Sequence, residues 1–341
     1  MELFLAFASL VAAVVPMVTY MVIIWWLDRN EREPFWMVLL CFFWGSTGAI
    51  VLAIIGSIIF QIPLATLIMS VADGDPSELL DLSGAVIVAP IVEEATKGVF
   101  LLVIALSRRF DGIVDGVVYG GAVGLGFGMT ENFMYFLSYG TTPMDWLFIV
   151  VVRTLFSAVM HCMATASLGA IIGYAKFKGL GWKMLLLPAG YALAVFLHFA
   201  WNATVSFEAT WWMGFLFLIM YFIAIFAIFQ IAIYAEGKTI HRELEDESIN
   251  GVIPADHLLH LPFVSKRNKK GWLHSSINHK EYVKTSIILA LRKHQYKSSK
   301  GNKQSIYLKE IESHRYKIQM MFYNAGLPVP NGKNNDPNNN Q

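Results

Sequence analysis

The segment GIVDGVVYGGAVGLGFG, residues 112–128, decides the fold of this chain. It carries a single charged side chain, Asp115, and a glycine at every fourth position from Gly112 to Gly128. Residues four apart lie on one face of a helix, so these glycines form a stripe without side chains. Such a stripe lets two helix backbones approach closely inside a membrane. We therefore predict a packing face here; the alternative is a groove that admits the backbone of a substrate.

The composition of the whole chain is that of a membrane protein. Of its 341 residues, 56% are hydrophobic and 15% are charged, and the mean hydropathy is +0.52. These values exclude an ordinary soluble domain. A helix needs about 20 apolar residues to cross the hydrocarbon core of a bilayer. Seven stretches of this kind predict an all-α, polytopic membrane helical bundle: 3–27, 36–60, 83–106, 113–137, 147–175, 183–206 and 211–235.

The basic residues of the loops indicate how this bundle is oriented. Lys and Arg occur in or beside the first, third and fifth loops, and the second, fourth and sixth loops contain none. These basic residues are Arg29, Arg32, Arg108, Arg109, Lys176, Lys178 and Lys183. Because Lys and Arg accumulate in cytoplasmic loops, we expect the N-terminus outside and the C-terminal tail in the cytoplasm. No basic segment precedes the first apolar run, so a cleaved signal peptide is not expected.

Charge divides the chain into parts. Residues from Glu236 onward contain 17 Lys and Arg against 10 Asp and Glu, whereas the residues before it contain 9 against 15. We predict a transmembrane bundle over 1–235 and a cytoplasmic, basic, partly helical tail over 236–327. The end of the chain, 328–341, is rich in Asn and Pro and is predicted to be disordered.

The tail contains a basic cluster beside Trp272. The cluster consists of Lys266, Arg267, Lys269 and Lys270. Such a cluster can rest on anionic lipid; the alternative is a solvated polar domain. Apolar spacing over 277–324 predicts two amphipathic helices, broken near 298–302. No motif indicates nucleic-acid binding.

Five glutamate and histidine side chains lie inside the predicted spans. They are Glu93, Glu94, Glu131, His161 and His198. A charged side chain at the centre of a membrane helix costs about 2.5 to 3.5 kcal/mol on insertion scales, so such residues usually face the interior of a bundle and mark a functional site. Because these five come from four different spans, we predict that they meet in one buried site.

Two of these carboxylates are adjacent in the sequence. Glu93 and Glu94 point about 100° apart on a helix, so one can face a cavity while the other turns to a neighbouring helix. Lys97 follows Glu93 by four residues and Glu94 by three, within reach of either. A neutralising pair of Glu93 with Lys97 that only holds helices together is the alternative, but it leaves the second glutamate unexplained.

Each histidine lies on a helix face of polar and small residues. His161 shares its face with Arg153, Ser157 and Thr165, each four residues from the next. His198 shares its face with Gly190, Ala194 and Asn202 at the same spacing. A single buried histidine is often only a hydrogen-bond partner between helices. Two such faces, at a depth similar to that of the glutamate pair, favour a common site instead.

Two mechanisms fit these residue types. His161, His198 and Glu131 could serve as the three protein ligands of a catalytic zinc, which keeps a fourth position open for water. Without a metal, Glu93 or Glu94 would activate water while both histidines and Asn202 hydrogen-bond the oxyanion. Asn202, one turn from His198, could also orient its ring. The sequence leaves the choice open.

The motifs that carry these residues resemble those of the PrsW family of intramembrane proteases. This family belongs to a larger group that includes the type II CAAX prenyl endopeptidases, whose own motifs are less similar. The matching elements are the charged segment LDRNEREP at 27–34, EExxK at Glu93, Glu94 and Lys97, FxxxE at Phe127 and Glu131, the histidine His161, and HxxxN at His198 and Asn202.

The resemblance implies hydrolysis of peptide bonds in or near the membrane. Its substrates would be membrane proteins or membrane-tethered regulators, and family members are described as metalloproteases or as glutamic proteases. Two other functions also use buried polar residues. A proton-coupled transporter with a Glu/His relay should show an inverted internal repeat, and the sequence shows no clear one. A non-catalytic scaffold would use the same polar faces only to join helices.

Overall fold

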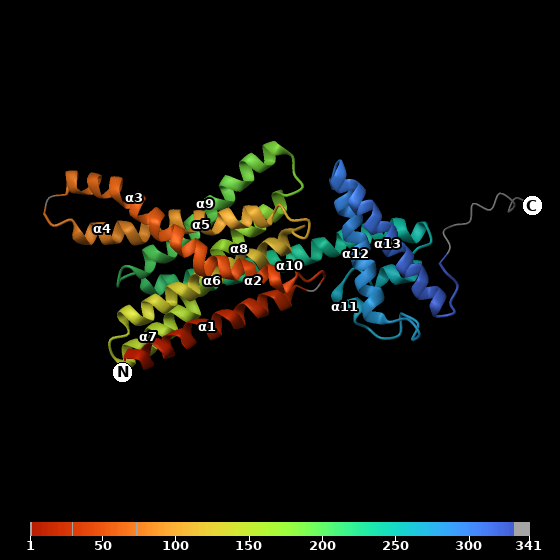
Figure 1. Cartoon of the computed structure of the whole chain (residues 1–341), viewed down its shortest axis with the longest axis horizontal. Helices are drawn as coiled ribbons and strands as arrows, with labels where there is room; N and C mark the ends of the chain where they lie inside the picture. Colours follow the sequence, from red (N-terminus) through yellow and green to blue (C-terminus); the bar gives the residue numbers. More distant parts are fainter. Residues whose placement is uncertain (1, 29, 73, 331–341) are drawn as a thin grey trace, which may run out of the picture. The chain divides into compact units, whose positions relative to one another are not determined.

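The chain is described here from a computed structural model, which covers residues 2–28, 30–72 and 74–330. All regular structure in these residues is helical, so the predicted all-α class is confirmed (Figure 1). Of the end predicted to be disordered, 328–341, residues 331–341 lie outside the described part.

The helices follow one another with short connections. In chain order they are α1 (Glu2–Leu27), α2 (Phe35–Trp44), η1 (Gly45–Ala49), α3 (Ile50–Val71), α4 (Ser77–Ser83), η2 (Gly84–Val88), α5 (Ala89–Ile104), α6 (Ile113–Tyr139), α7 (Pro143–Val152), η3 (Arg153–Ser157), α8 (Ala158–Ala175), α9 (Leu180–Val205), α10 (Trp211–Ile249), η4 (Ala255–Leu259), α11 (Val264–Arg267), α12 (His279–Ser298) and α13 (Asn302–Asn324). The segments η1, η2 and η3 are π-helical and continue into the α-helices around them.

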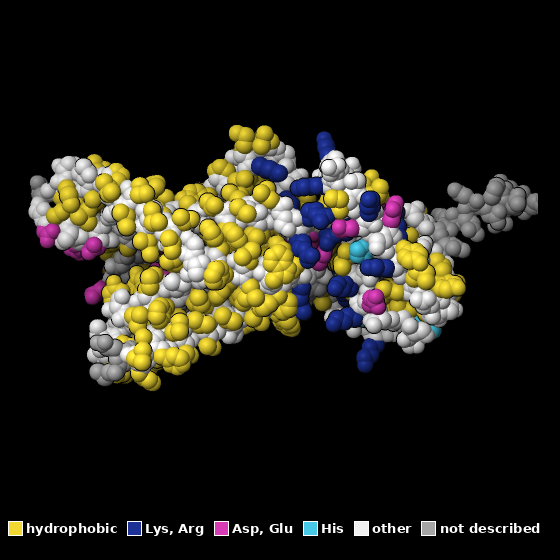
Figure 2. Space-filling view, in the orientation of Figure 1, with side chains coloured by type: hydrophobic (Ala, Val, Ile, Leu, Met, Phe, Trp, Pro, Cys, Tyr) yellow, Lys and Arg dark blue, Asp and Glu magenta, His cyan; other side chains and the backbone are white. Residues whose placement is uncertain are grey.

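Within the described ranges, six helices are long and apolar enough to cross a membrane. They are Leu3–Leu27, Phe35–Val71, Ile113–Tyr139, Pro143–Ala175, Leu180–Val205 and Trp211–Ile249. The one remaining predicted span is 83–106, the third along the chain. It is helical as far as Ile104 but carries Glu93, Glu94 and Lys97 in its middle. Its charges must therefore be buried among other helices rather than exposed to lipid. The polytopic helical bundle predicted from composition is confirmed, and apolar side chains cover much of its visible face (Figure 2).

The described residues form two compact units. Among the described residues, the first comprises 2–28, 32–72 and 74–229, and the second comprises 30–31 and 230–330. The second unit therefore includes a short piece of the loop between α1 and α2 as well as the C-terminal part of the chain.

Helix α6 is the most buried of the six long apolar helices in the described part of the chain. A Cβ atom added to Gly116, Gly120 or Gly124 would lie less than 3.0 Å from the backbone of α8, at Gly169, Thr165 and His161 respectively. The glycine stripe is thus a packing face, as its spacing predicts, because only glycine allows these two backbones to come so close. This contact sets the side chains of α6 and α8 against each other along the bundle.

The second unit has a core of its own. Ile240 and Leu244 of α10 pack with Tyr282 and Leu289 of α12 and with Ile318 of α13. Helices α12 and α13 are the two amphipathic helices predicted from apolar spacing, and the break between them contains Gly301, whose φ of 63° suits glycine. Ion pairs join the same helices. They are Glu247 with Lys293 at 2.8 Å and with Arg315 at 2.7 Å, and Glu243 with Lys297 at 2.7 Å.

Candidate active site

Four helices bring the predicted ionisable residues together. Helix α5 supplies Glu93, Glu94 and Lys97, α6 supplies Glu131, α8 supplies His161 and α9 supplies His198. Glu94 and Lys97 are completely buried, and both histidines are nearly so. The two imidazole rings meet edge to face, with their centroids 4.8 Å apart. The charges of the predicted span 83–106 are therefore turned into the bundle.

Glu94 is held by three donors. Its Oε1 accepts hydrogen bonds from Lys97 Nζ at 2.6 Å and from His198 Nδ1 at 3.0 Å, and its Oε2 accepts one from Thr165 Oγ1 at 3.0 Å. An ionised carboxylate is only an acceptor, so His198 must carry its proton on Nδ1. The other ring nitrogen of His198, Nε2, is then left with its lone pair and lies 3.9 Å from Glu93 Oε2.

His161 is held by a carboxylate on one side and an ammonium on the other. Its Nε2 lies 2.6 Å from Glu131 Oε2, and its Nδ1 lies 3.2 Å from Lys97 Nζ. Because a lysine ammonium can only donate, Nδ1 accepts from Lys97 and Nε2 donates to Glu131. Arg153 adds a second positive partner to Glu131, with Nη2 3.0 Å from the same oxygen.

Glu93 differs from the other carboxylates of the cluster. Its Oε2 is buried and has no hydrogen-bond partner among the residues that the structure describes. The nearest positive group is Lys97 Nζ at 3.7 Å, which is too long for a hydrogen bond. The Glu93 side chain is nevertheless 14% exposed, and that of Glu131 is 18% exposed. These two carboxylates are therefore the part of the cluster that is not fully enclosed by protein.

A possible metal-ligand group lies at this point. Single ligand atoms of Glu93, His161 and His198 lie within 4.8 Å of one another. The sequence analysis chose Glu131 as the carboxylate ligand instead. In the described structure Glu131 is not part of this group, because its carboxylate is turned to Nε2 of His161 and to Arg153.

Asn202 lies one turn from His198, but its side chain points elsewhere. Its Nδ2 donates to the carbonyl oxygen of Ala85 in η2, at 2.8 Å. This bond ties α9 to the helical turn that precedes α5. Asn202 thus contributes to the relative position of the helices that carry His198 and Glu93, and its amide is directed at the backbone rather than at the imidazole ring.

A comparison with known families identifies the bundle. The profile of the family described as PrsW family intramembrane metalloprotease matches residues 33–229, which is more than half of the chain. The chain belongs to the PrsW family. It is therefore an intramembrane peptidase in a lipid environment, acting on membrane-protein substrates, as the motifs predict. Family membership favours this function over the transporter and the scaffold that the polar faces also allow.

Curated relatives agree with this assignment. The protein named Protease PrsW of Bacillus subtilis is 25% identical over 210 residues, which is 60% of this chain and 86% of that protein. The protein of the same name from Clostridioides difficile is 26% identical over 218 residues, covering 63% and 86%. That of Shouchella clausii is 32% identical over 116 residues, covering 34% and 51%. No solved structure matches the chain.

The PrsW profile and the first compact unit end at the same residue, Phe229. At the other end, the profile begins at Glu33, whose carboxylate accepts a hydrogen bond from the hydroxyl of Tyr119 on α6. Burial raises the pKa of Glu33 to about 8. Glu33 also lies close to Asp28 and Asp115 in a second buried acidic group that the sequence analysis did not predict. The charged segment of the PrsW motif is thus attached to the central helix.

Sequence reasoning missed the roles of two neighbours of the cluster in this PrsW chain. Arg153 pairs with Glu131, and Thr165 donates to Glu94. Both stand on the same helix face as His161, eight residues before it and four after it, so the spacing contained the signal. The π-helical segments η2 and η3, which directly precede α5 and α8, were not predictable from the sequence. Such segments occur frequently at functional sites.

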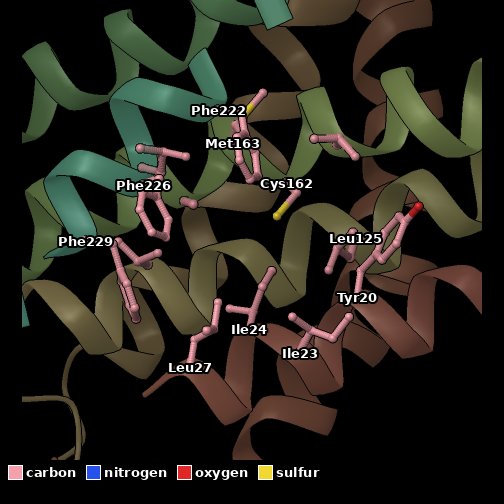
Figure 3. A pocket seen from close by; sticks show the side chains of 14 residues that line it. Tyr20, Ile23, Ile24, Leu27, Leu125, Cys162, Met163, Phe222, Phe226 and Phe229 are labelled. Carbon is pink, nitrogen blue, oxygen red and sulfur yellow. The ribbon is translucent and has the colours of Figure 1, made fainter. Parts of the chain in front are cut away.

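A separate apolar pocket lies among α1, α6, α8 and α10 (Figure 3). Its volume is about 310 Å³, and Tyr20, Ile24, Cys162 and Phe226 are among the residues that line it. None of the described residues that line it is charged or is a histidine. This pocket therefore lacks the groups that hydrolysis requires, although Cys162 is adjacent to His161 in the sequence.

Proposed function

We propose that this PrsW-family peptidase holds a zinc ion with His161, His198 and Glu93, and that Glu94 and Glu131 position the two imidazole rings. It would cleave peptide bonds of membrane proteins or membrane-tethered regulators at this cluster. The observation that carries the proposal is the buried Glu93 Oε2, which lacks a hydrogen-bond partner within the described residues and faces His198 Nε2 at 3.9 Å.

The donor set fits the metal. Two histidines and one carboxylate, with a fourth position left for water, are a common ligand set of catalytic zinc. In each ring, the nitrogen that would not bind the metal is hydrogen-bonded to a carboxylate. These bonds join Nδ1 of His198 to Glu94 and Nε2 of His161 to Glu131. Carboxylates in this position fix the orientation of metal-binding histidines and increase their basicity. When bound, zinc would lower the pKa of its water to about 7 and polarise the substrate carbonyl.

The remaining residues prepare the site. Lys97 offsets the negative charge of Glu93 and Glu94 inside the bundle, since its Nζ lies 3.7 Å and 2.6 Å from their carboxylates. Arg153 does the same for Glu131. The partial exposure of Glu93 and Glu131 supports water entry from their side. Without a metal, Glu93 would accept a proton from water most easily, because it has the fewest hydrogen bonds of the three carboxylates.

One contact favours a metal-free mechanism instead. Lys97 Nζ lies 3.2 Å from His161 Nδ1, the nitrogen that would face the metal. In the metal-free version Glu93 acts as the general base, and each imidazole must take up a second proton before it can hydrogen-bond the oxyanion, because its one proton is donated to a carboxylate. Asn202 would act only through the position of α9 in both versions.

Metal analysis and fragment proteomics together test the proposal. We expect about one zinc per chain in detergent-purified wild type, and loss of zinc in His198→Ala but not in the exposed control His274→Ala. Cells with the wild type should contain membrane-protein fragments that are missing from cells with Glu93→Gln. Cleavage by metal-free protein would reject the zinc assignment but would still support the peptidase function. An unchanged fragment pattern in Glu93→Gln would reject the site itself.

The orientation of the chain is a separate proposal. The alternation of basic loops supports an outside N-terminus and a cytoplasmic second unit. Cysteines introduced one at a time at Ser77 and at Ser276, both exposed, would test it with a membrane-impermeant thiol reagent on intact cells. We expect labelling at position 77 only. Labelling at position 276 only would indicate the opposite orientation.

A further inference from the structure

Helix α10 changes from apolar to polar at a well-defined place in the second unit. Its apolar run ends at Ala235, and Glu236 and Lys238 follow directly. The ring of Tyr234, one residue before this boundary, stacks on Phe263, with centroids 5.6 Å apart and planes at 23°. The same Phe263 ring lies against Gly237, where an added Cβ would meet it at 2.7 Å. The segment that begins at Phe263 is therefore fixed beside the place where the apolar run of α10 ends.

One lysine lies near each of these two rings. Lys238 Nζ lies 4.8 Å from the centre of the Tyr234 ring, and Lys266 Nζ lies 5.7 Å from the centre of the Phe263 ring. Lys269 and Lys270 follow on the same turn, and all four lysines are exposed. Aromatic rings flanked by lysines are typical of the boundary between hydrocarbon and lipid headgroups.

Negative charge is absent from this segment of the sequence. No Asp or Glu occurs from His257 to Lys280, although five Lys and Arg do. The nearest acidic residue on α10, Glu236, accepts a hydrogen bond from Asn30 at 2.5 Å. A surface of exposed lysines at headgroup level is complementary to negatively charged lipid, and each lysine near such a surface adds attraction.

Arg267 has a different role from the lysines around it. Its side chain is only 3% exposed, and its Nη2 donates to Asn30 Oδ1 at 2.7 Å and to the Pro262 carbonyl oxygen at 3.0 Å. Its own carbonyl oxygen accepts from Trp272 Nε1 at 3.0 Å. The sequence analysis grouped Arg267 and Trp272 with the lysines in one lipid-facing cluster. The structure instead makes Arg267 the internal support of the turn that presents them.

We propose that Lys238, Lys266, Lys269 and Lys270 form a binding surface for the headgroups of anionic phospholipids. The proposal does not depend on the proteolytic mechanism, because these lysines lie in the second unit and outside the PrsW match. Lipid is the partner because the Tyr234 and Phe263 rings place the lysines at the membrane surface. The surface would hold the second unit at an anionic membrane and leave a zwitterionic one unrecognised.

Lysine labelling of the full-length protein in nanodiscs tests the proposal. One set of discs contains phosphatidylcholine alone, and the other contains an added share of phosphatidylglycerol. An amine-reactive reagent is applied briefly, and modification of each lysine is measured by mass spectrometry. We expect several-fold slower labelling of Lys266, Lys269 and Lys270 in the anionic discs, and equal labelling of the exposed α13 lysines Lys303, Lys309 and Lys317. At 1 M salt, where the Debye length falls to about 3 Å, the difference should disappear.

Charge reversal provides a second measurement. The triple variant Lys266→Glu, Lys269→Glu, Lys270→Glu is compared with the matched variant Lys303→Glu, Lys309→Glu, Lys317→Glu. Protein extracted from mixed discs should retain less phosphatidylglycerol in the first variant only. All six lysines are exposed, so both variants should keep the wild-type melting temperature. Equal labelling in the two kinds of disc, or equal lipid retention in the two variants, would overturn the proposal.

Discussion

Among single residues, Glu94 is the most constrained member of the site. Its two oxygens accept from Lys97, His198 and Thr165. In Glu94→Gln, an amide nitrogen replaces one acceptor and the negative charge that Lys97 needs is lost. We expect cleavage to fall by about 10- to 100-fold or more, the range typical of residues that orient metal-binding histidines. The measurement is the yield of substrate fragments, with the exposed Glu245→Gln as control.

A Glu94→Gln protein that does not fold would also show no cleavage. Removing one partner of a buried ion pair costs about 3 to 5 kcal/mol, so the thermal stability of Glu94→Gln must be measured beside its turnover. Wild-type turnover in a folded Glu94→Gln protein would contradict the positioning role.

Lys97 permits a prediction that separates the two mechanisms. Its ammonium lies 3.2 Å from His161 Nδ1, so it repels any cation that this nitrogen would bind. Lys97→Met should therefore bind zinc more tightly than the wild type, and should be less stable without zinc because Glu93 and Glu94 lose their counter-charge. We expect zinc to raise the melting temperature of Lys97→Met by more than it raises that of the wild type or of Lys178→Met. An equal or smaller rise would argue for the metal-free mechanism.

At the scale of helices, the contact of α6 with α8 positions Glu131 against His161. A methyl group at Gly116 would collide with the Gly169 carbonyl, whereas a methyl at Gly112 would meet no described atom within 4 Å. Overpacking of this kind typically costs about 1 to 3 kcal/mol. We predict that Gly116→Ala lowers the melting temperature and the zinc content, and that Gly112→Ala changes neither. Equal behaviour of the two variants would show that the close approach does not support the site.

The sequence predicted the helices more completely than it predicted the site. Apolar length and glycine spacing are properties of one helix, so the spans and the α6 packing face were readable. The choice between Glu93 and Glu131 as the carboxylate near both histidines depends on how neighbouring helices rotate about their axes. A single sequence does not contain that angle. The same reason explains Asn202, whose spacing from His198 suggested a ring partner but whose side chain reaches Ala85 on another helix.

At the scale of the whole molecule, the part beyond the PrsW match is more than an appended tail. The second unit incorporates Asn30 and Glu31 from the loop between α1 and α2. Asn30 bonds to Glu236 and Arg267, and Glu31 accepts from Arg292 at 2.8 Å. The chain therefore enters the second unit twice, and Glu33, which follows this loop, is bonded to Tyr119 of the bundle. The loop between α1 and α2 therefore connects the second unit to the first unit along the chain, in addition to the connection within α10.

The stability of the second unit should depend on pH. Burial lowers the pKa of His257 and of His294 below the usual value near 6.5. Below that pH the unfolded chain binds protons at these positions while the folded unit stays neutral there, so the unfolded state binds more protons and stability falls. Their contribution is fully present above about pH 6.5 and is lost as the pH drops through the folded pKa values. We expect a lower melting temperature at pH 5 than at pH 7.

His257 should account for part of this change of melting temperature with pH. Its Nδ1 lies 2.8 Å from the Tyr282 hydroxyl, and its ring contacts Trp272 with centroids 5.1 Å apart. His257→Gln keeps a hydrogen-bonding side chain but removes the titration, so its melting temperature should fall less between pH 7 and pH 5 than that of the wild type. The exposed control His274→Gln should keep the full slope. Hydrogen exchange of peptides from α12 would assign the change to the second unit, and a His257→Gln slope as steep as that of the wild type would mean that other groups cause the acid sensitivity.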